Sequence, residues 1–382
     1  MRLLALASCA VVGTAALAVA GFVLSLPGAR PRGAPTTLVS SRERAELLAQ
    51  LRPPKRARPV VAVLASNAGT ETTDFVVPFG VLSASDAAEV FAVAPSAEPV
   101  TLMPALRIRP ELDVASFDAR FPDGADYVVV PAMHHSDDPA VLLWLGNQVR
   151  SGATVVGICE GALVLAHAGL LDGRSATTHW FALSRLRRAS PQMVWQRDRR
   201  YVIDRGVVTT TGVSASIPIS LTLVEAIAGR ARADALAGEL GVLSFDSAHS
   251  SAAFALDRAT LWIGARNALA LWSHESLDVA LEYGIDEVAL ALTADAYART
   301  YETSVRSVSA AREVVSRHGL TFIADATDTG AEGSRISLPD PGNSALDAAL
   351  AGIRRRYGAG TAEFVALQLE YEPGPPAHAG GL

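Results

Sequence analysis

The chain has 382 residues, half of them hydrophobic, and a net charge of −6. This length suits two domains with a sizeable core, and the apolar content excludes a disordered protein. The negative charge provides no overall basic field for nucleic acid, and two cysteines, Cys9 and Cys159, exclude a disulfide framework.

The N-terminal stretch is strongly apolar. No charged residue occurs from Leu3 to Ala29, which is long enough to cross a bilayer with some tilt. We therefore interpret residues 1–29 as a single-pass membrane anchor. The alternative is a cleaved signal peptide, which would make the mature protein secreted or periplasmic. The side of the membrane on which the rest of the protein lies stays open.

Residues 30–59 are rich in proline and arginine and are typical of a linker.

The next region alternates apolar strands with helices. Residues 60–64 form a near-continuous apolar run, typical of a strand buried on both faces of a parallel sheet. Further strands are expected at 91–94 and 127–131, with helices beginning at Asp74 and near residue 140. This order predicts an α/β fold with a parallel sheet sandwiched by helices and with ligands at the carboxyl ends of the strands.

The strand at 154–156 leads into the pattern with the most chemical content. Gly157 and Gly161 bracket Cys159, and a helix begins at Ala162. Gly-x-Cys-x-Gly between strand and helix has the form of a nucleophile elbow. The sharp turn requires small neighbours, and the backbone N–H groups that follow can favour a thiolate or an oxyanion. The alternative is a small buried cysteine at an ordinary strand–helix junction.

Several motifs appear together in one order along the chain. They are Asp74-Phe75-x-x-Pro78-Phe79, Gly157–Ala162, Ala168–Arg174 and Ala176–Trp180. With these motifs the chain resembles the PfpI family, also called the DJ-one family, over roughly residues 60–243. Within it, the similarity is greatest to the branch of GlxA-type regulators and isonitrile hydratase. The resemblance implies a flavodoxin-like fold with the cysteine at the elbow and an acidic residue, here Asp74, beside it.

The sequence departs from the family pattern at two places. Protease-like and deglycase-like relatives carry His directly after the cysteine, and this chain has Glu160. The Gly-Gly that commonly follows the third strand is replaced by Ala132-Met133. Both differences weaken the case for family catalysis.

The candidate site follows from the elbow and the resemblance. Cys159 is the candidate nucleophile, Asp74 its proton partner, and Glu160 and Gly161 complete the elbow, whose N–H groups would bind an oxyanion. The candidate residues of the substrate pocket are Ala132, Met133, His134 and His179. Neighbouring His and Asp residues at 134–138 imitate a metal site, but adjacent His side chains tend to point apart. We expect neither a metal nor another cofactor.

Residues 244–382 repeat part of the first region. Residues 277–281, 284–288 and 305–309 echo the opening strand, the Asp74 helix and the second strand, and Asp286 falls where Asp74 does. Residues 314–323 loosely match 100–108, but there is no second cysteine elbow. This pattern predicts a smaller, degenerate α/β repeat that packs on the first region or mediates pairing, which allows a homodimer. The alternative is an unrelated α/β appendage.

Two functions fit these observations. The main expectation is a membrane-tethered enzyme in which Cys159 attacks a small electrophilic substrate, with hydrolase, hydratase or amidotransferase-like chemistry. The alternative is a non-enzymatic sensor whose pocket binds a small ligand or whose cysteine is oxidised reversibly. GlxA-type regulators carry a C-terminal helix-turn-helix pair. The corresponding part of this chain has no basic recognition helix, so we expect no nucleic-acid binding.

Overall fold

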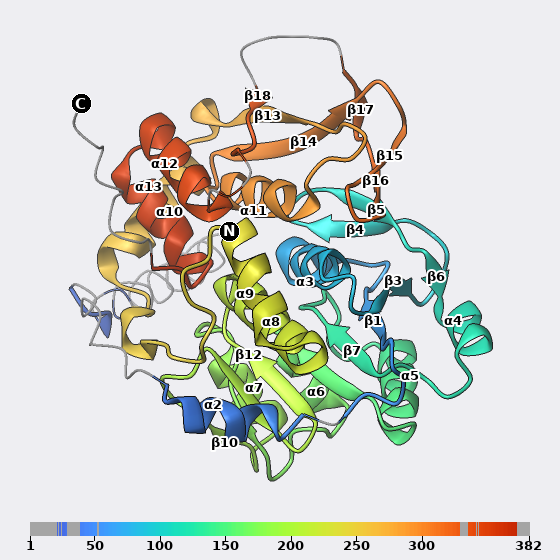
Figure 1. The fold of residues 1–382 in the computed structure, drawn as a ribbon. Coiled ribbons are helices and arrows are strands. Elements are labelled where there is room, and N and C mark those ends of the chain that lie inside the picture. The colour runs from blue at the N-terminus through green and yellow to red at the C-terminus, as the bar shows by residue number, and fades with distance from the viewer. Residues whose placement is uncertain are drawn as a thin grey trace, which may run out of the picture.

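A computed structural model describes residues 21, 23, 25–28, 39–51, 53–328, 335–340, 342 and 344–372 of the chain. A seven-stranded sheet dominates the larger part, with the strand order β11-β12-β8-β7-β1-β3-β6 (Figure 1). Its strands are β1 (Val60–Leu64), β3 (Glu89–Ala94), β6 (Leu112–Asp113), β7 (Tyr127–Val130), β8 (Thr154–Gly157), β11 (Tyr201–Asp204) and β12 (Val207–Thr210). All neighbours pair in parallel except β11 with β12.

The strand order confirms the predicted fold class. Counted along the chain, β1, β3, β7, β8 and β12 lie in the order 2-1-3-4-5, which is that of flavodoxin-like folds. The β1 and β7 residues are all buried, as expected for inner strands of a parallel sheet covered on both faces.

Helices cover both faces of this sheet. The odd-numbered β1 valines, Val61 and Val63, share a hydrophobic cluster with α3 (Thr72–Ala84), α8 (Ser216–Ala228) and α9 (Arg230–Glu239). Val60, Ala62 and Leu64 point to the other face. The helices there are α4 (Val114–Arg120), α5 (Pro139–Arg150), α6 (Gly161–His167) and α7 (Leu183–Ala189). A two-stranded sheet, β9 (Ser175–Ala176) with β10 (Val194–Trp195), and a 3₁₀ turn at Val213–Ala215 lie between these helices in the chain.

The C-terminal region has its own parallel sheet, in the order β17-β14-β13-β18. The strands are β13 (Glu275–Ala280), β14 (Thr303–Ser309), β17 (Ala326–Thr327) and β18 (Arg335–Ile336). The helices are α10 (Arg258–Leu269), α11 (Glu287–Ala298), α12 (Ala345–Tyr357) and α13 (Ala359–Gln368), with 3₁₀ turns at Ser251–Ala253 and Leu271–Ser273. This arrangement confirms further α/β structure after the first region.

A third sheet joins the two regions. Its order is β15-β16-β5-β4-β2, from β15 (Glu313–Val315), β16 (Thr321–Ile323), β5 (Arg107–Arg109), β4 (Val100–Met103) and β2 (Thr70–Glu71). At its centre β16 of the C-terminal region pairs antiparallel with β5. Alongside this junction α11 packs on α3 (Figure 1). A side chain at Gly80 would place its Cβ 2.6 Å from Val288 Cγ2, so glycine permits this close helix crossing.

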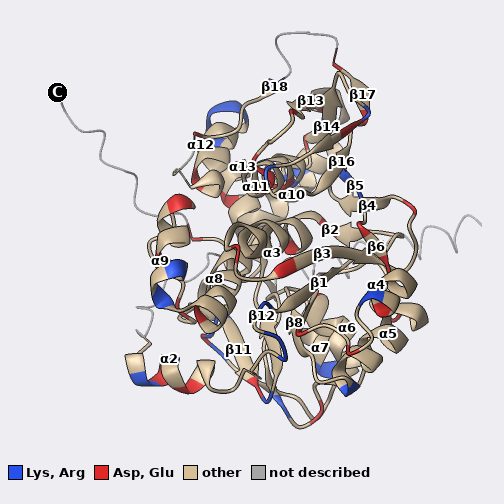
Figure 2. Cartoon of the chain, turned by 45° about the vertical axis from the view of Figure 1, so that its right-hand side comes forward, with Lys and Arg blue, Asp and Glu red and all other residues tan. Residues whose placement is uncertain are grey.

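Charged residues of both signs are interspersed on the same elements, as on α2 (Ser41–Leu48) and α9 (Figure 2). The run Arg354–Arg356 occupies the last turn of α12, where positive charge complements the helix dipole.

Part of the segment assigned as a linker lies against the first region. Arg44 of α2 pairs with Glu225 of α8, and Arg56 pairs with the buried Asp126.

The expected membrane anchor requires correction. A bilayer-spanning helix needs about 20 mostly apolar residues, and no helix in the described part of the chain has the length and apolarity to cross a membrane. This finding contradicts the interpretation of the chain as membrane-tethered or signal-bearing, and with it the localisation drawn from that interpretation. Most of the segment 1–29 on which the interpretation relied lies outside the described residues.

The junction between the regions predicts the effect of truncation. A chain ending at Leu243 lacks α11 and β16, so it exposes the apolar face of α3 and the edge of β5. Exposed apolar faces and strand edges promote association. We expect the shortened chain to aggregate or to change its association state, measured by size exclusion with light scattering. The full-length Asp286→Ala variant is the control and should behave as the wild type. A shortened chain that keeps the full chain's association state would contradict this expectation.

Candidate functional site

Cys159 lies on a strained turn between β8 and α6. Its φ angle is 55°, a conformation that costs energy for a residue other than glycine. Two hydroxyl groups hold the turn from either side: the Cys159 N–H donates to Thr210 Oγ1 at 3.0 Å, and Thr178 Oγ1 donates to the Cys159 carbonyl at 2.9 Å. At Gly161 an added Cβ would lie 2.0 Å from the Val130 carbonyl oxygen. The elbow therefore has a steric requirement for glycine at this position.

Asp74 lies in the first turn of α3 and is fully buried. Its Oδ2 accepts a hydrogen bond from the Ala132 N–H at 3.2 Å, whereas its Oδ1 has no hydrogen-bond partner among the described residues. Glu71 caps the same helix, since its carboxylate accepts the Asp74 N–H at 2.6 Å. The Glu71 N–H in turn donates to the Ala132 carbonyl at 2.9 Å. The residues after β7 and the start of α3 are thus bonded to each other in both directions.

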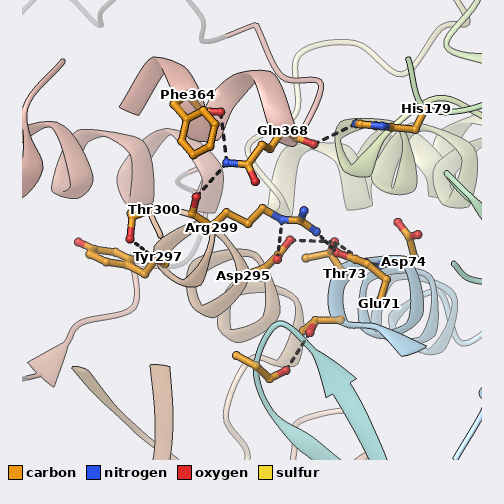
Figure 3. Close-up of polar contacts among 12 residues, drawn as sticks. Glu71, Thr73, Asp74, His179, Asp295, Tyr297, Arg299, Thr300, Phe364 and Gln368 are labelled. Atoms are coloured by element: carbon orange, nitrogen blue, oxygen red, sulfur yellow. Dashed lines mark hydrogen bonds and ion pairs between the residues drawn. The ribbon is translucent and has the colours of Figure 1, made fainter. Parts of the chain in front are cut away.

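The C-terminal region contributes two further charges to this site. Arg299, at the C-terminal end of α11, binds Glu71 Oε1 at 2.6 Å and Asp295 Oδ1 at 2.7 Å. Thr73 Oγ1 lies 3.3 Å from Asp295 Oδ2. Figure 3 shows the Arg299 guanidinium lying among Asp295, Thr73 and Glu71, with Asp74 close by. The side chains of this cluster therefore come from both halves of the chain.

Burial dominates the proton affinities in the cluster. It raises the pKa of Glu71 and of Asp74 to about 7 each, and that of Asp295 to about 8. Neighbouring carboxylates add to the shift, Asp74 for Glu71 and Asp295 for Asp74. Burial alone would lower the pKa of Arg299, but Asp295 and Glu71 raise it. One guanidinium faces three carboxyl groups, so the cluster holds protons near neutral pH.

The same environment acts on the cysteine. Cys159 is 7% exposed, and burial raises the pKa of its thiol, with Asp74, Glu160 and Glu71 adding to the effect through their negative charge. The N-terminus of α6 favours a thiolate, but the helix begins beside these carboxyl groups. Burial and the neighbouring carboxyl groups therefore oppose the thiolate that the sequence led us to expect.

Two of the elbow amides are already bonded within the protein. The Gly161 N–H donates to the Ile158 carbonyl at 2.6 Å, and the Cys159 N–H is taken by Thr210. The side chain of Glu160 binds Arg185 of α7 at 2.5 Å. The Gly161 amide, which the sequence suggested as an oxyanion donor, is therefore engaged within the turn.

The remaining candidate pocket residues have different surroundings. Ala132 binds the acidic cluster through its backbone, and the buried Met133 forms an isolated bridge with Thr70. His134 is exposed, and its ring lies edge-on against that of His135, with the centroids 4.6 Å apart. Among the described residues no group of three His, Cys, Asp or Glu side chains is arranged to hold a metal ion.

His179 connects the elbow region to α13. Its Nδ1 accepts from the Phe181 N–H at 3.3 Å, and its Nε2 lies 3.0 Å from the Gln368 carbonyl, which can only accept (Figure 3). These bonds assign a neutral ring with the proton on Nε2. Burial lowers the pKa of His179, which also favours the neutral form. Both ring nitrogens are occupied, so His179 positions the loop.

Sequence reasoning missed Glu71, Asp295 and Arg299. Glu71 had a local signal, because it precedes the Thr-Thr-Asp74 run at a helix start. Asp295 and Arg299 had a weaker one, an acid and a base four residues apart at the end of an otherwise apolar helix. Nothing in the sequence relates that pair to a site more than two hundred residues earlier.

The chain was compared with known proteins. The DJ-1/PfpI family model matches residues 60–226. The isonitrile hydratase of Pseudomonas putida is 32% identical over 164 residues, which are 41% of this chain and 67% of that protein. The HTH-type transcriptional regulator CdhR of Pseudomonas aeruginosa is 42% identical over 86 residues, which are 22% of this chain and 25% of CdhR. The crystal structure of Drosophila melanogaster DJ-1beta matches with a TM-score of 0.44 at 22% identity, covering 49% of this chain and 100% of that one. The family model and the isonitrile hydratase match confirm the predicted resemblance.

The elbow geometry predicts a steric penalty at Gly161. We expect Gly161→Ala to lower the free energy of unfolding by about 3 kcal/mol or more, because the new methyl group would collide with the backbone at Val130. Gly146→Ala in α5 is the matched control. Its nearest neighbour would be an arginine side chain at 3.6 Å, so this variant should be neutral or slightly stabilising. Equal stability of the two variants in denaturant unfolding would refute the steric account.

The charge cluster predicts a pH-dependent effect of Arg299→Met. The carboxyl pKa values of about 7 to 8 lie above their unfolded values near 4, so the cluster's contribution to stability is complete below about pH 4 and is lost as pH rises towards 8. Without the Arg299 guanidinium, the loss of stability with rising pH should be larger. We expect a destabilisation of about 3–5 kcal/mol at pH 8, and clearly less at pH 5, where the carboxyl groups are protonated.

The control for this prediction is Arg306→Met. Arg306 pairs with Asp278 on the surface, where its side chain is 50% exposed. Exposed pairs contribute at most about 1 kcal/mol, so this variant should show a small effect at both pH values. Denaturant unfolding from pH 5 to pH 8 measures both variants. The cluster account fails if the Arg299→Met penalty is the same at the two ends of that range.

Proposed function

The chain belongs to the DJ-1/PfpI family, and from this premise we propose that the Cys159 site recognises a small molecule in a non-enzymatic sensor. The observation that carries the proposal is the absence of activation at the elbow among the described residues. Cys159 is buried, its thiol pKa is raised by burial and by nearby carboxyl groups, and the Gly161 amide is bonded to Ile158. A nucleophilic enzyme needs a thiolate or an adjacent base, and donors for the developing oxyanion.

The neighbouring side chains support the same proposal. His179, the histidine that could have served as a base, has both ring nitrogens occupied, and Glu160 is bound to Arg185. The polar groups left for a ligand are the Asp74 Oδ1, which has no partner among the described residues, and the Cys159 thiol beside it. A protonated Asp74 can donate a hydrogen bond to a ligand, and an ionised one can accept.

The charge of the cluster restricts the ligand class. Glu71, Asp74 and Asp295 face the single guanidinium of Arg299. Whichever of these carboxyl groups is ionised repels an anion, whereas a neutral or cationic polar molecule can hydrogen-bond to them in either protonation state. We therefore propose a small uncharged or cationic ligand. Reversible oxidation of Cys159 is a weaker alternative, because redox sensors use low-pKa, accessible thiols.

The relatives support both classes of function to different extents. CdhR is named a transcriptional regulator, which agrees with a sensing role, but the match covers a quarter of that protein. Isonitrile hydratase is named as an enzyme and matches over two thirds of its length. The protonation of the Cys159 thiol distinguishes a sensor from a nucleophilic enzyme. The membrane-tethered enzyme expected from the sequence is not proposed again.

The test is the pH dependence of Cys159 alkylation by iodoacetamide. An ordinary thiol titrates near ~8.5. We expect the Cys159 midpoint above that value, because burial and the nearby carboxyl groups disfavour the thiolate. Asp74→Asn should lower the midpoint by removing one of those groups. Asp286→Asn, on the corresponding helix of the C-terminal region, should leave it unchanged. A midpoint below the ordinary value would overturn the proposal and favour a nucleophilic enzyme.

A further inference from the structure

Helix α13 ends in a turn that carries a buried acid. The Tyr371 N–H donates to the Ala366 carbonyl at 2.9 Å, and the Glu370 N–H donates to the Leu367 carbonyl at 3.1 Å. These two bonds form a Schellman motif, whose left-handed position is usually glycine. Glu370 occupies that position with a φ angle of 53°. A side chain costs free energy in this conformation, and so does a carboxylate at the C-terminal end of a helix. The contacts of the Glu370 side chain must offset both costs.

The Glu370 carboxylate joins three segments of the chain. The residue is 3% exposed. Its Oε2 accepts the Gly212 N–H at 2.7 Å and, over a longer 3.4 Å, the Trp180 N–H. Its Oε1 lies 3.0 Å from His249 Nε2, and the His249 ring stacks on Phe254 with the centroids 5.1 Å apart. A buried carboxylate is costly without such partners, so the three segments are held to one point.

The backbone of the same turn is bound by the first region as well. The last carbonyl groups of a helix have no acceptor role within it and need partners from elsewhere. Four consecutive carbonyl groups, those of residues 367–370, accept hydrogen bonds here. The donors are the Trp180 Nε1, the His179 Nε2, and the N–H and hydroxyl groups of Ser214. The end of α13 is therefore fixed to two loops of the first region, residues 177–180 and 211–214.

These two loops adjoin the hydroxyl groups that hold the elbow. Thr178 donates to the Cys159 carbonyl and immediately precedes His179. Thr210 accepts the Cys159 N–H and lies two residues before Gly212. The left-handed conformation of the cysteine persists only while its surroundings hold it. The end of α13 thus lies one or two residues away from both of the groups that hold this turn.

The packing at Gly212 leaves no slack between α13 and the loops. An added Cβ at Gly212 would lie 2.7 Å from the Glu370 Cβ and 2.7 Å from the His179 Cδ2. Figure 3 shows His179 and the backbone of Gln368 meeting across the two regions. Because atoms are in contact on both sides of Gly212, this loop cannot shift unless the end of α13 shifts with it.

We propose that Glu370 is a positioning residue for the Cys159 site. Its carboxylate holds the two loops, the threonine hydroxyl groups beside them hold the cysteine turn, and this turn keeps the thiol buried. Glu370 itself has no hydrogen bond or ion pair with Cys159 or Asp74 in the described part of the chain. The C-terminal region thereby controls the accessibility of the site from a distance. The proposal rests on the small-molecule role proposed above for the same site.

The experiment compares Cys159 alkylation in full-length Glu370→Gly and Glu370→Gln across pH, read on the Cys159 peptide by mass spectrometry. Glycine suits the left-handed turn, so Glu370→Gly keeps the helix end and loses only the carboxylate. We expect its alkylation rate at a fixed pH to differ from the wild type by about tenfold, a midpoint shift of about one pH unit. Glu370→Gln retains an acceptor for the Gly212 N–H, so its rate should stay within about twofold of the wild type.

A variant on the same helix separates positioning from a loss of stability. Phe364 is 7% exposed, and its ring lies 5.1 Å from that of Tyr301, away from the two loops. Phe364→Ala should lower the unfolding temperature and leave the Cys159 profile unchanged. Thermal unfolding confirms that each variant is folded.

Three outcomes would overturn the positioning role. They are a wild-type profile in folded Glu370→Gly, an equal shift in Phe364→Ala, and a Glu370→Gln profile that matches Glu370→Gly. The readout is the difference between each variant and the wild type. It therefore does not depend on whether the wild-type midpoint lies above or below that of an ordinary thiol, which is the test of the sensor itself.

Discussion

The contact of Arg299 with Glu71 and Asp295 is the interaction on which the rest of the site depends. It joins the last turn of α11 to the first turn of α3, and so joins the two halves of the chain beside the cysteine. Burying three carboxyl groups together is costly, and one guanidinium offsets part of that cost only because its geometry satisfies two of them at once. Protonation of the carboxyl groups offsets the rest of this cost, in keeping with the raised pKa values of Glu71 and Asp295.

The two ends of the packed helix pair α3–α11 have different surroundings. Beside the pairing of Ile108 with Phe322, one end of the α3–α11 pair carries the charged cluster next to the elbow. The other end has Gly80 and Ala84 in the corresponding places and encloses a cavity. The two halves of one chain can differ in this way, because each contributes its own side chains to the shared helix interface. A symmetric dimer of identical chains would carry the same residues at both ends.

The elbow shows that a motif and its chemistry are separable. The strained turn, the close approach of Gly161 to Val130 and the hydroxyl groups of Thr178 and Thr210 fix the backbone of the cysteine. These features concern steric fit and hydrogen bonding. Activation of the thiol concerns electrostatics, and here burial and neighbouring carboxyl groups oppose it. The motif therefore supplies a well-positioned thiol, while its surroundings decide the protonation state.

The sequence by itself determined the elements that depend on local pattern. Apolar runs at 60–64 and 154–156 became inner strands, and the spacing of Gly157, Cys159 and Gly161 placed the turn between strand and helix. Hydropathy alone was misleading at the N-terminus, since an apolar stretch predicted an anchor that the described helices do not provide. Local patterns identify strands, turns and caps because those depend on neighbours in the chain.

Only the tertiary structure decided the composition of the site and the state of its groups. Arg299 reaches Glu71 across 228 residues of sequence, and His179 reaches Gln368 across 189. The protonation of Cys159 and Asp74 depends on how deeply the assembled regions bury them. The cavity lies where Gly80 and Ala84 of α3 come together with residues of α11 and α12. Burial, long-range ion pairs and empty volume are properties of packed elements, so no run of neighbouring residues encodes them.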